Sequence, residues 1–368
     1  MRVIGVSRSR SRPWLACAAS ACLALLGAGT GAGYGQTVPA AGVAGAAGLL
    51  TYITPATSAN TSTDVVLANA NGSDPQTLGP GGPAVLAPNG KFVAAVTSTA
   101  AQASHGSSLI LYTVGKKSAP RTLEKTADQL TLVAWSADSS EIAVIDGDAM
   151  VVVSRGGVAR TVSTGPAGTA ITGASFEPNS QRLVYALASS LLVGAPVNLY
   201  TVAASGGSAT EITHNGYSQN PLWGPNGIVF SRATAKDQVY QLWFIEANGH
   251  DAEPLTHVAI SSPFSGLEPI AFSQNGKHLL ANLIGQNTAQ AWVVDLSTKH
   301  VVARELGAPG AVTIGNAISA DGKRILLTNG YSSLSDDDFS GLSVEAVPWS
   351  GVSSTLLAAH GAFASWSG

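Results

Sequence analysis

Short apolar runs, broken every few positions by glycine, proline, serine, asparagine or aspartate, fill the chain from residue 48 to its end. One sequence motif recurs among them. It consists of a large apolar residue, a short spacer, and then Asn-Gly or Asp-Gly, with serine in place of the glycine in some copies. Its large apolar residue falls at Leu86, Trp135, Phe176, Trp223, Phe272, Ile318 and Trp366, in steps of 41 to 49 residues. A period of this length, made of strand-like segments, is typical of a β-propeller with one blade per repeat.

Each repeat predicts four antiparallel strands. The recurring motif ends the first strand, and its Asn-Gly or Asp-Gly pair suits a tight hairpin. The predicted second strands are Phe92–Val96, Ile142–Ile145, Leu183–Leu187, Ile228–Ser231, Leu279–Leu283 and Ile325–Thr328. The predicted third strands are Leu109–Val114, Met150–Ser154, Asn198–Ala203, Tyr240–Glu246, Gln290–Leu296 and Leu342–Val347. A glycine-rich or polar turn then leads to a short fourth strand. No segment after the N-terminal region keeps a 3.6-residue period, so we expect an all-β fold with almost no helix.

The two ends of the repeat region complement each other. The segment Leu49–Leu78 predicts every strand of a repeat except the first, and Ala362–Ser367 predicts a first strand with nothing after it. Pairing them closes a ring and leaves no open strand edge. The sequence therefore predicts a seven-bladed β-propeller at 48–368; six blades with frayed ends is the alternative.

The N-terminal region has the pattern of a secretory signal. Residues 1–35 begin with four arginines, continue with the apolar run Trp14–Leu26 and end in small residues. Residues 36–47 are rich in alanine, glycine and proline and predict a flexible linker. We therefore expect a periplasmic or secreted protein with no transmembrane segment once the signal is removed. A retained membrane anchor is the alternative.

Cysteine usage agrees with this interpretation. Cys17 and Cys22 both lie in the expected signal, so its removal leaves a chain without disulfide or thiol chemistry. Attachment of a lipid to Cys22 is a further alternative, although the leucine usual three places before such a cysteine is missing.

The charge of the chain excludes one class of partner. The sequence has 19 Lys and Arg against 22 Asp and Glu, and removal of the four signal arginines leaves 15 against 22, a net charge of −7. No basic stripe is present either. The chain lacks the basic surface of a nucleic-acid-binding protein.

The repeat at Glu211–Thr256 points to a family. It contains Ile-Thr-His at 212–214, Pro-Leu-Trp-Gly-Pro-Asn-Gly at 221–227 and Pro-Leu-Thr at 254–256. These motifs resemble the repeat of TolB-type propellers, a WD40-like (PD40-type) bacterial repeat, and the other repeats match less sharply. The resemblance implies an envelope propeller that acts as a protein-binding or scaffold module. TolB itself has six blades and a preceding α/β domain, neither of which this sequence predicts.

Catalytic and metal motifs are missing from the sequence. Its seven histidines are scattered, with no His-x-His or His-Glu-x-x-His pair, and there is no Gly-x-Ser-x-Gly elbow. We therefore predict no catalytic residue and no cofactor. Asp336, Asp337 and Asp338 are weak candidates for calcium; a solvated acidic loop is the favoured explanation.

Loops that join fourth to first strands, and second to third strands, emerge on one face of a propeller and are the longer ones here. Long loops on a rigid scaffold often bind ligands. The candidate contact residues in these loops are Tyr217, Arg232, Lys236, Phe264, Glu268, Tyr331 and Phe339. Each of them, taken alone, also fits ordinary surface.

These patterns favour a non-enzymatic, monomeric binding module that holds an envelope protein or peptide segment at the long-loop face. The alternative is a propeller hydrolase or lactonase with a metal in the axial channel, to which Glu268, His257 and Asp336 would contribute. A cell-surface structural or adhesive protein is a third interpretation.

Overall fold

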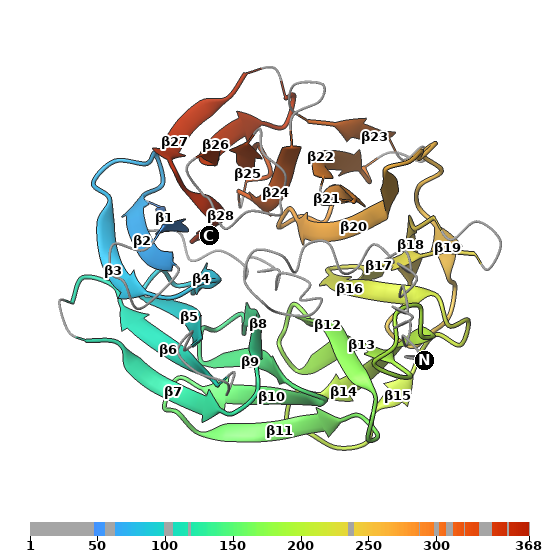
Figure 1. Ribbon diagram of the computed structural model, residues 1–368. Coiled ribbons are helices and arrows are strands. Elements are labelled where there is room, and N and C mark those ends of the chain that lie inside the picture. Colours follow the sequence, from blue (N-terminus) through green and yellow to red (C-terminus); the bar gives the residue numbers. More distant parts are fainter. Residues whose placement is uncertain are drawn as a thin grey trace, which may run out of the picture.

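The computed structural model describes residues 48–55, 63–98, 106–116, 119–234, 239–286, 288–297, 302–306, 312–319, 321–330, 341–351 and 353–367. The expected signal and linker lie outside these residues. In the described part, seven four-stranded antiparallel sheets surround a common axis as the blades of a propeller (Figure 1).

The strands of each blade are given from the innermost outward. Blade 1 is β28 (Ala362–Trp366), β1 (Leu49–Pro55), β2 (Thr63–Asn69) and β3 (Gln76–Pro80). Blade 2 is β4 (Ala84–Leu86), β5 (Phe92–Ser98), β6 (Ser107–Thr113) and β7 (Arg121–Thr126). Blade 3 is β8 (Leu130–Trp135), β9 (Glu141–Asp146), β10 (Ala149–Ser154) and β11 (Ala159–Thr164). Blade 4 is β12 (Ala170–Phe176), β13 (Arg182–Ala188), β14 (Val197–Ala203) and β15 (Thr210–Glu211).

The remaining blades follow the same plan. Blade 5 is β16 (Ser218–Gly224), β17 (Gly227–Arg232), β18 (Gln241–Ile245) and β19 (Glu253–Pro254). Blade 6 is β20 (Phe264–Phe272), β21 (His278–Gly285), β22 (Thr288–Asp295) and β23 (Val302–Glu305). Blade 7 is β24 (Val312–Ile318), β25 (Arg324–Gly330), β26 (Ser343–Pro348) and β27 (Thr355–Ala359). The predicted seven-bladed all-β fold is confirmed, and the described residues contain no helical segment with the length and hydrophobicity of a bilayer span.

The ring closes by pairing its two ends. In β28 and β1, Trp366 lies opposite Leu50 and Ser365 lies opposite Thr51. Beyond the strand, the Leu49 N–H donates to Ser367 Oγ at 2.9 Å and the Ser367 N–H donates to the Leu49 carbonyl at 3.0 Å. The predicted closure is therefore confirmed, and β1 is not left as an open edge.

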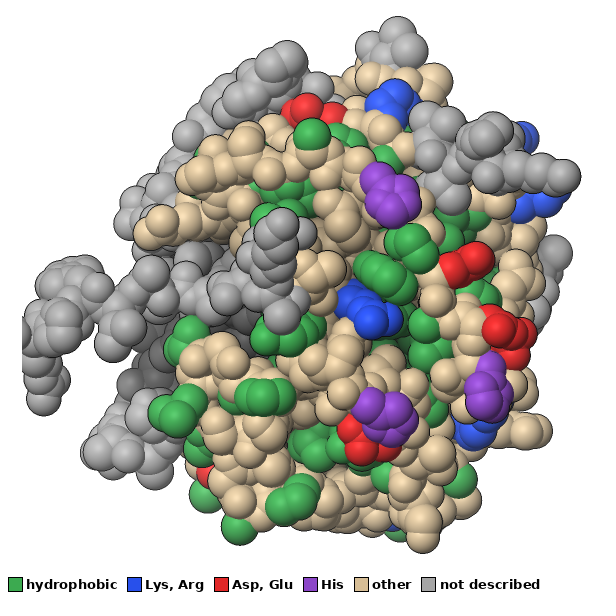
Figure 2. Space-filling view, turned by 90° about the vertical axis from the view of Figure 1, so that its right-hand side faces the viewer, with side chains coloured by type: hydrophobic (Ala, Val, Ile, Leu, Met, Phe, Trp, Pro, Cys, Tyr) green, Lys and Arg blue, Asp and Glu red, His purple; other side chains and the backbone are tan. Residues whose placement is uncertain are grey.

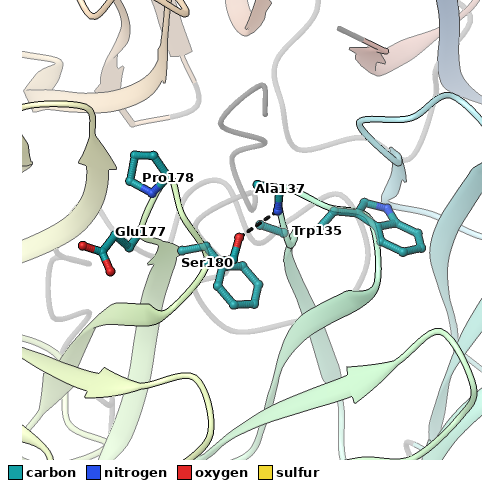
Figure 3. A pocket seen from close by; sticks show the side chains of 7 residues that line it. Trp135, Ala137, Glu177, Pro178 and Ser180 are labelled. Carbon is teal, nitrogen blue, oxygen red and sulfur yellow. Dashed lines mark hydrogen bonds between the residues drawn. The ribbon is translucent and has the colours of Figure 1, made fainter. Parts of the chain in front are cut away.

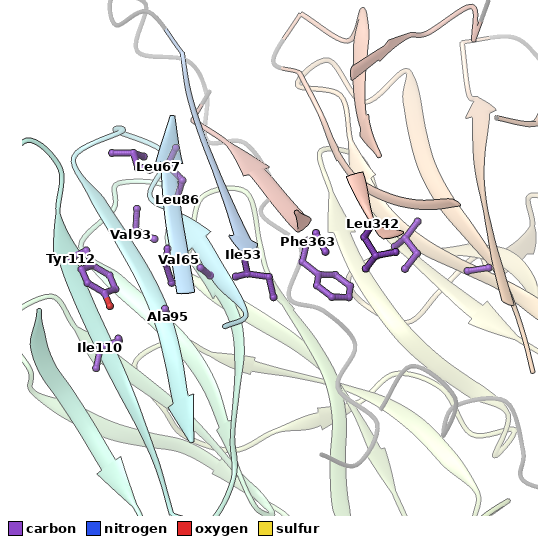
Figure 4. Packing of buried hydrophobic residues seen from close by; sticks show 14 of the residues in the cluster. Ile53, Val65, Leu67, Leu86, Val93, Ala95, Ile110, Tyr112, Leu342 and Phe363 are labelled. Carbon is purple, nitrogen blue, oxygen red and sulfur yellow. The ribbon is translucent and has the colours of Figure 1, made fainter. Parts of the chain in front are cut away.

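The recurring apolar residue fills the space between blades. Seven clusters of buried hydrophobic residues occur among the described residues, and each contains one member of the recurring set. Each member packs against the preceding blade, as Trp135 does where its Nε1 donates to the Val85 carbonyl at 3.0 Å. In the cluster between blades 1 and 2, Phe363 of β28 extends the packing toward Leu342 of blade 7 (Figure 4).

Charged side chains contribute little to this framework. On the side of the ring that carries β18 and β19, acidic, basic and histidine side chains are scattered among polar and apolar ones and form no large patch of one charge (Figure 2). The partly exposed pair Arg160–Glu141 has its closest N–O distance at 2.6 Å. Exposed pairs of this kind contribute about 1 kcal/mol or less. The fold therefore depends on apolar packing and strand pairing.

Serine replaces glycine in two hairpin turns and links them to the neighbouring blades. Gly90, Gly276 and Gly322 occupy this turn position with φ of 67–70°, and Ser139 and Ser180 adopt φ of 61° there. This conformation is costly for a residue with a side chain. The hydroxyls offset the cost, because the Asn89 and Ala137 backbone N–H groups of the preceding turns donate to Ser139 Oγ at 3.1 Å and Ser180 Oγ at 2.7 Å.

The turn contact between blades 3 and 4 borders a small pocket (Figure 3). The pocket has a volume of about 10 Å³, enough for a single water molecule. It lies on the face of the short hairpin turns, and its size makes it a packing defect rather than a ligand site.

The Ser180 contact can be tested with two substitutions. Ser180→Ala removes the hydroxyl and keeps the unfavourable φ, so we expect it to lower the free energy of unfolding by about 1 kcal/mol. Ser180→Gly removes the same bond but relieves the backbone, so its effect should be smaller. Chemical denaturation measures both. Equal losses for the two variants would contradict this account.

Ring closure can be tested by truncation. Deleting 362–368 removes β28, uncovers the edge of β1 and the hydrophobic faces of blades 1 and 7, and should lower the melting temperature and cause aggregation. Deletion of Gly368 alone is the matched control. Thermal melting and light scattering give the readout, and a truncated chain as stable and soluble as the control would show that closure is dispensable.

Candidate functional site

Two polar side chains meet beside the axis where blades 5 and 6 adjoin. Asn220 lies in β16 and Glu268 in β20, the innermost strands of these blades. The Asn220 Nδ2 donates to Glu268 Oε1 at 2.8 Å. Inner strands otherwise carry mainly apolar side chains into the blade interfaces, so this pair is a departure from the repeat.

The Glu268 carboxyl is crowded by protein but not sealed from solvent. The residue is of intermediate exposure, and its Oε2 is neither hydrogen-bonded to a described residue nor among the fully buried unpartnered atoms. One carboxyl oxygen is thus held by Asn220 and the other stays open. No ion pair within the described residues includes Glu268.

Burial raises the pKa of Glu268 to about 7, and the hydrogen bond from Asn220 opposes that rise. Removal from water disfavours the charged form of a carboxyl group. A carboxylate in this position would be stabilised by a cation, and the described part of the protein does not supply one.

Asn220 sits in a bulge of β16. The pairing of β16 with β17 shifts register between Gln219 and Leu222, and Asn220 has a φ of 51°. Asparagine tolerates this left-handed conformation better than most residues. Bulges re-aim side chains and are common beside functional sites. Here the bulge turns the Asn220 amide toward the next blade, where Glu268 accepts its hydrogen bond.

Aromatic side chains and one arginine lie at the long-loop end of the same blades. The Arg232 guanidinium lies over the Trp243 ring, 4.2 Å from its centroid, and burial lowers the pKa of Arg232. Burial raises the pKa of Tyr240, and the nearby Tyr217 adds to that rise. Tyr240 is held firmly, because its N–H donates to the Ser265 carbonyl at 2.9 Å.

An apolar loop tip projects from blade 4 on this face. Leu191, Leu192 and Val193 are 74%, 77% and 66% exposed, and they follow one another in the loop between β13 and β14. The base of the loop is tied to blade 5, since the Val197 N–H donates to the Gly216 carbonyl at 3.0 Å beside Tyr217. Three consecutive exposed aliphatic residues are unusual on a monomer surface and are typical of interaction sites.

Four of the seven predicted contact residues fall on blades 5 and 6. Tyr217 and Arg232 lie at the long-loop end of blade 5, and Phe264 begins β20, where it is half-buried in the cluster between blades 5 and 6. Glu268 was expected in a loop and lies instead in the middle of β20, because the first strand of this repeat begins earlier than its apolar residues indicate. Lys236, Tyr331, Phe339, Asp336, Asp337 and Asp338 lie outside the described residues.

Sequence reasoning missed several residues of this region. Tyr240 and Trp243 were assigned to a strand and Asn220 was given no role, and nothing in their spacing marks them as contact residues. The run Leu191–Val193 did carry a signal: it is an apolar stretch between serines and glycine that belongs to neither flanking strand.

The described histidines do not assemble. His214, His250, His257 and His360 are exposed, and His278 stacks on Trp349 with ring centroids 3.9 Å apart. Within the described residues, no group of three or more His, Cys, Asp or Glu comes together as a metal-ligand set. His105 and His300 lie outside them.

The fold and this site define a class of protein: a closed seven-bladed β-propeller with polar, aromatic and exposed aliphatic side chains toward its long-loop face. TolB from Acinetobacter baumannii is similar in structure, with 13% identity, a TM-score of 0.52 and coverage of 88% of this chain and 84% of that one. An oligogalacturonate lyase, solved in complex with manganese, has 14% identity, a TM-score of 0.58 and coverage of 84% and 85%. No family model and no curated protein matches the sequence.

The β-propeller domain of the Trilobed protease from Pyrococcus furiosus is also similar, with 8% identity, a TM-score of 0.62 and coverage of 89% of this chain and 98% of that one. That domain is described as having an open velcro topology. In the present chain β28 pairs with β1, so the ring is closed. At these identities the similarities establish the propeller fold, which unrelated functions share.

The environment of Glu268 predicts a pH-dependent stability. The folded pKa of about 7 lies above the ordinary value of 4.5, so between these pH values the folded state holds a proton that the unfolded state has lost. Stability should therefore fall as pH rises across this window and stay level above it.

The variant Glu268→Gln removes this titration and keeps the shape of the side chain. Its free energy of unfolding should exceed that of the wild type at pH 8 by at most about 3 kcal/mol. The difference between the two proteins should be smaller near pH 5. Urea denaturation at the two pH values measures this. If the free energy of unfolding differed between Glu268→Gln and the wild type by the same amount at both pH values, the prediction would be contradicted.

Proposed function

We propose that the chain is an exported, non-enzymatic propeller of the bacterial cell envelope that holds a protein segment at its long-loop face. The observation that carries the proposal is the exposed apolar tip Leu191–Val193, whose loop is tied to blade 5 by the backbone hydrogen bond from Val197 to Gly216. Exposed aliphatic residues on a face that also carries aromatic side chains and an arginine match the composition of protein–protein contact surfaces.

The resemblance of the repeat at Glu211–Thr256 to TolB-type propellers supports the envelope setting, as does the expected signal at residues 1–35. The structural similarity to TolB agrees with it at the level of the fold. The scaffold is suited to holding its loops in fixed positions, because buried hydrophobic side chains pack its blades against one another. Binding would rely on preorganised loops, with no covalent step.

Capture experiments with and without the apolar tip test the proposal. Crosslinking of the full chain in the envelope of its own cells, followed by mass spectrometry, should give one dominant protein partner. Replacing Leu191, Leu192 and Val193 together by serine should reduce its recovery at least tenfold, because roughly 1.4 kcal/mol of lost contact energy is a factor of ten in affinity. Tyr217→Ala should weaken recovery as well.

The chain offers a matched control on its opposite face. Val158 is 70% exposed in the short turn between β10 and β11, so Val158→Ser removes an exposed aliphatic residue away from the proposed surface. This variant should leave recovery unchanged. Equal recovery with the wild type, the triple variant and the control would refute a partner site at the long-loop face.

The alternative function is a propeller hydrolase or lactonase, and the observation that favours it is Glu268. A carboxyl group with a pKa of about 7 is suited to general acid–base catalysis at neutral pH. Metal analysis of the purified, dialysed chain tests the metal-dependent form of this idea. A stoichiometric ion that is lost in Glu268→Gln would favour the enzyme, and its absence from the wild type would count against it.

A further inference from the structure

We propose that Glu268 and Asn220 together bind a positively charged side chain, lysine or arginine, of the protein segment held at the long-loop face. This inference rests on the proposed function and specifies the chemistry of the partner. Three observations support it. The pair has oxygens that accept no hydrogen bond, Glu268 has no ion-pair partner among the described residues, and the bulge of β16 positions Asn220.

The pair leaves two acceptor oxygens open. One N–H of Asn220 Nδ2 is donated to Glu268 Oε1, and Glu268 Oε2 and Asn220 Oδ1 accept no hydrogen bond from a described residue. Both atoms keep contact with solvent, since neither is among the fully buried unpartnered atoms. Ammonium and guanidinium groups are donors without acceptors and therefore match these two oxygens.

The charge of the site selects a cation over a neutral donor. A crowded carboxylate without an ion pair is costly, and a cation that arrives with the ligand offsets that cost. A hydrogen bond between a cationic donor and a carboxylate is also stronger than one between neutral groups.

The elements packed against β20 supply no competing charge at Glu268. β16, β18 and β24 carry no titratable side chain. Arg232 ends β17 and lies over Trp243, Tyr240 precedes β18, and His278 of β21 stacks on Trp349. Burial is the cause that raises the pKa of Glu268, and none of these three side chains contributes to it.

The backbone supports a built site. Asn220 is held at a φ of 51° within the bulge of β16, a conformation that costs free energy and persists only where the surrounding structure imposes it. The alternative residue for such a φ is glycine, which would leave Glu268 without its hydrogen bond. The asparagine therefore both satisfies the bulge and adds an acceptor beside the carboxylate.

The test uses two small probes of nearly the same shape. N-acetyl-arginine amide carries a guanidinium, and N-acetyl-citrulline amide carries a neutral urea in its place. Carbon-13 NMR of the full chain would follow the Glu268 carboxyl signal, identified by its absence in Glu268→Gln. The arginine probe should shift this signal and lower its titration midpoint, and the citrulline probe should do neither.

The affinity for the arginine probe should rise about tenfold between pH 6 and pH 8, because a group with a pKa near 7 is about one-tenth ionised at the lower pH and nine-tenths at the higher. Asn220→Gly, which tolerates the same backbone, should weaken binding several-fold. Glu268→Gln should abolish both binding and its pH dependence.

Equal binding of the two probes, retention of arginine binding by Glu268→Gln, or no binding of either probe would overturn the proposal. None of these results bears on capture of a partner through Leu191–Val193, which is measured separately. If that capture failed while the arginine probe bound at Glu268, the charged site would stand and the protein-binding function would not.

Discussion

A blade of this propeller is a sheet whose two faces are both apolar, and the need to cover both faces governs the whole structure. A single sheet of this kind cannot be stable in water, because burying one face leaves the other exposed. Seven blades in a ring solve the problem only when the ring is closed. The pairing of β28 with β1 is therefore the contact on which the packing between blades 7 and 1 depends.

Closure also creates the setting of the candidate site. The inner strands are held from both sides by neighbouring blades, so polar side chains placed on them are positioned rigidly. Asn220 and Glu268 come from adjacent blades and meet only because those blades are packed together. The same packing restricts the access of water to the carboxyl and raises its pKa. A rigid scaffold thus makes an otherwise ordinary glutamate available for a specific electrostatic interaction.

Local sequence patterns were sufficient to predict the repeat. The large apolar residue before each turn, the turn residues and the β-branched runs specify a hairpin over a few positions, and the 41- to 49-residue spacing repeats it. Even the closure could be predicted, because one end lacks a first strand and the other end supplies one. The start of β20 was harder to predict, since Glu268 and Pro269 interrupt its apolar run.

The sequence by itself predicted the class of fold, a ring of seven blades with six as the alternative, and the face that carries the long loops. These depend on periodicity and turn chemistry, which are local. Only the tertiary structure decided that Glu268 meets Asn220, that Arg232 covers Trp243 and that Leu191–Val193 stands out from the surface. Such contacts join residues whose spacing follows no rule along the chain, because they depend on how one blade is rotated against the next.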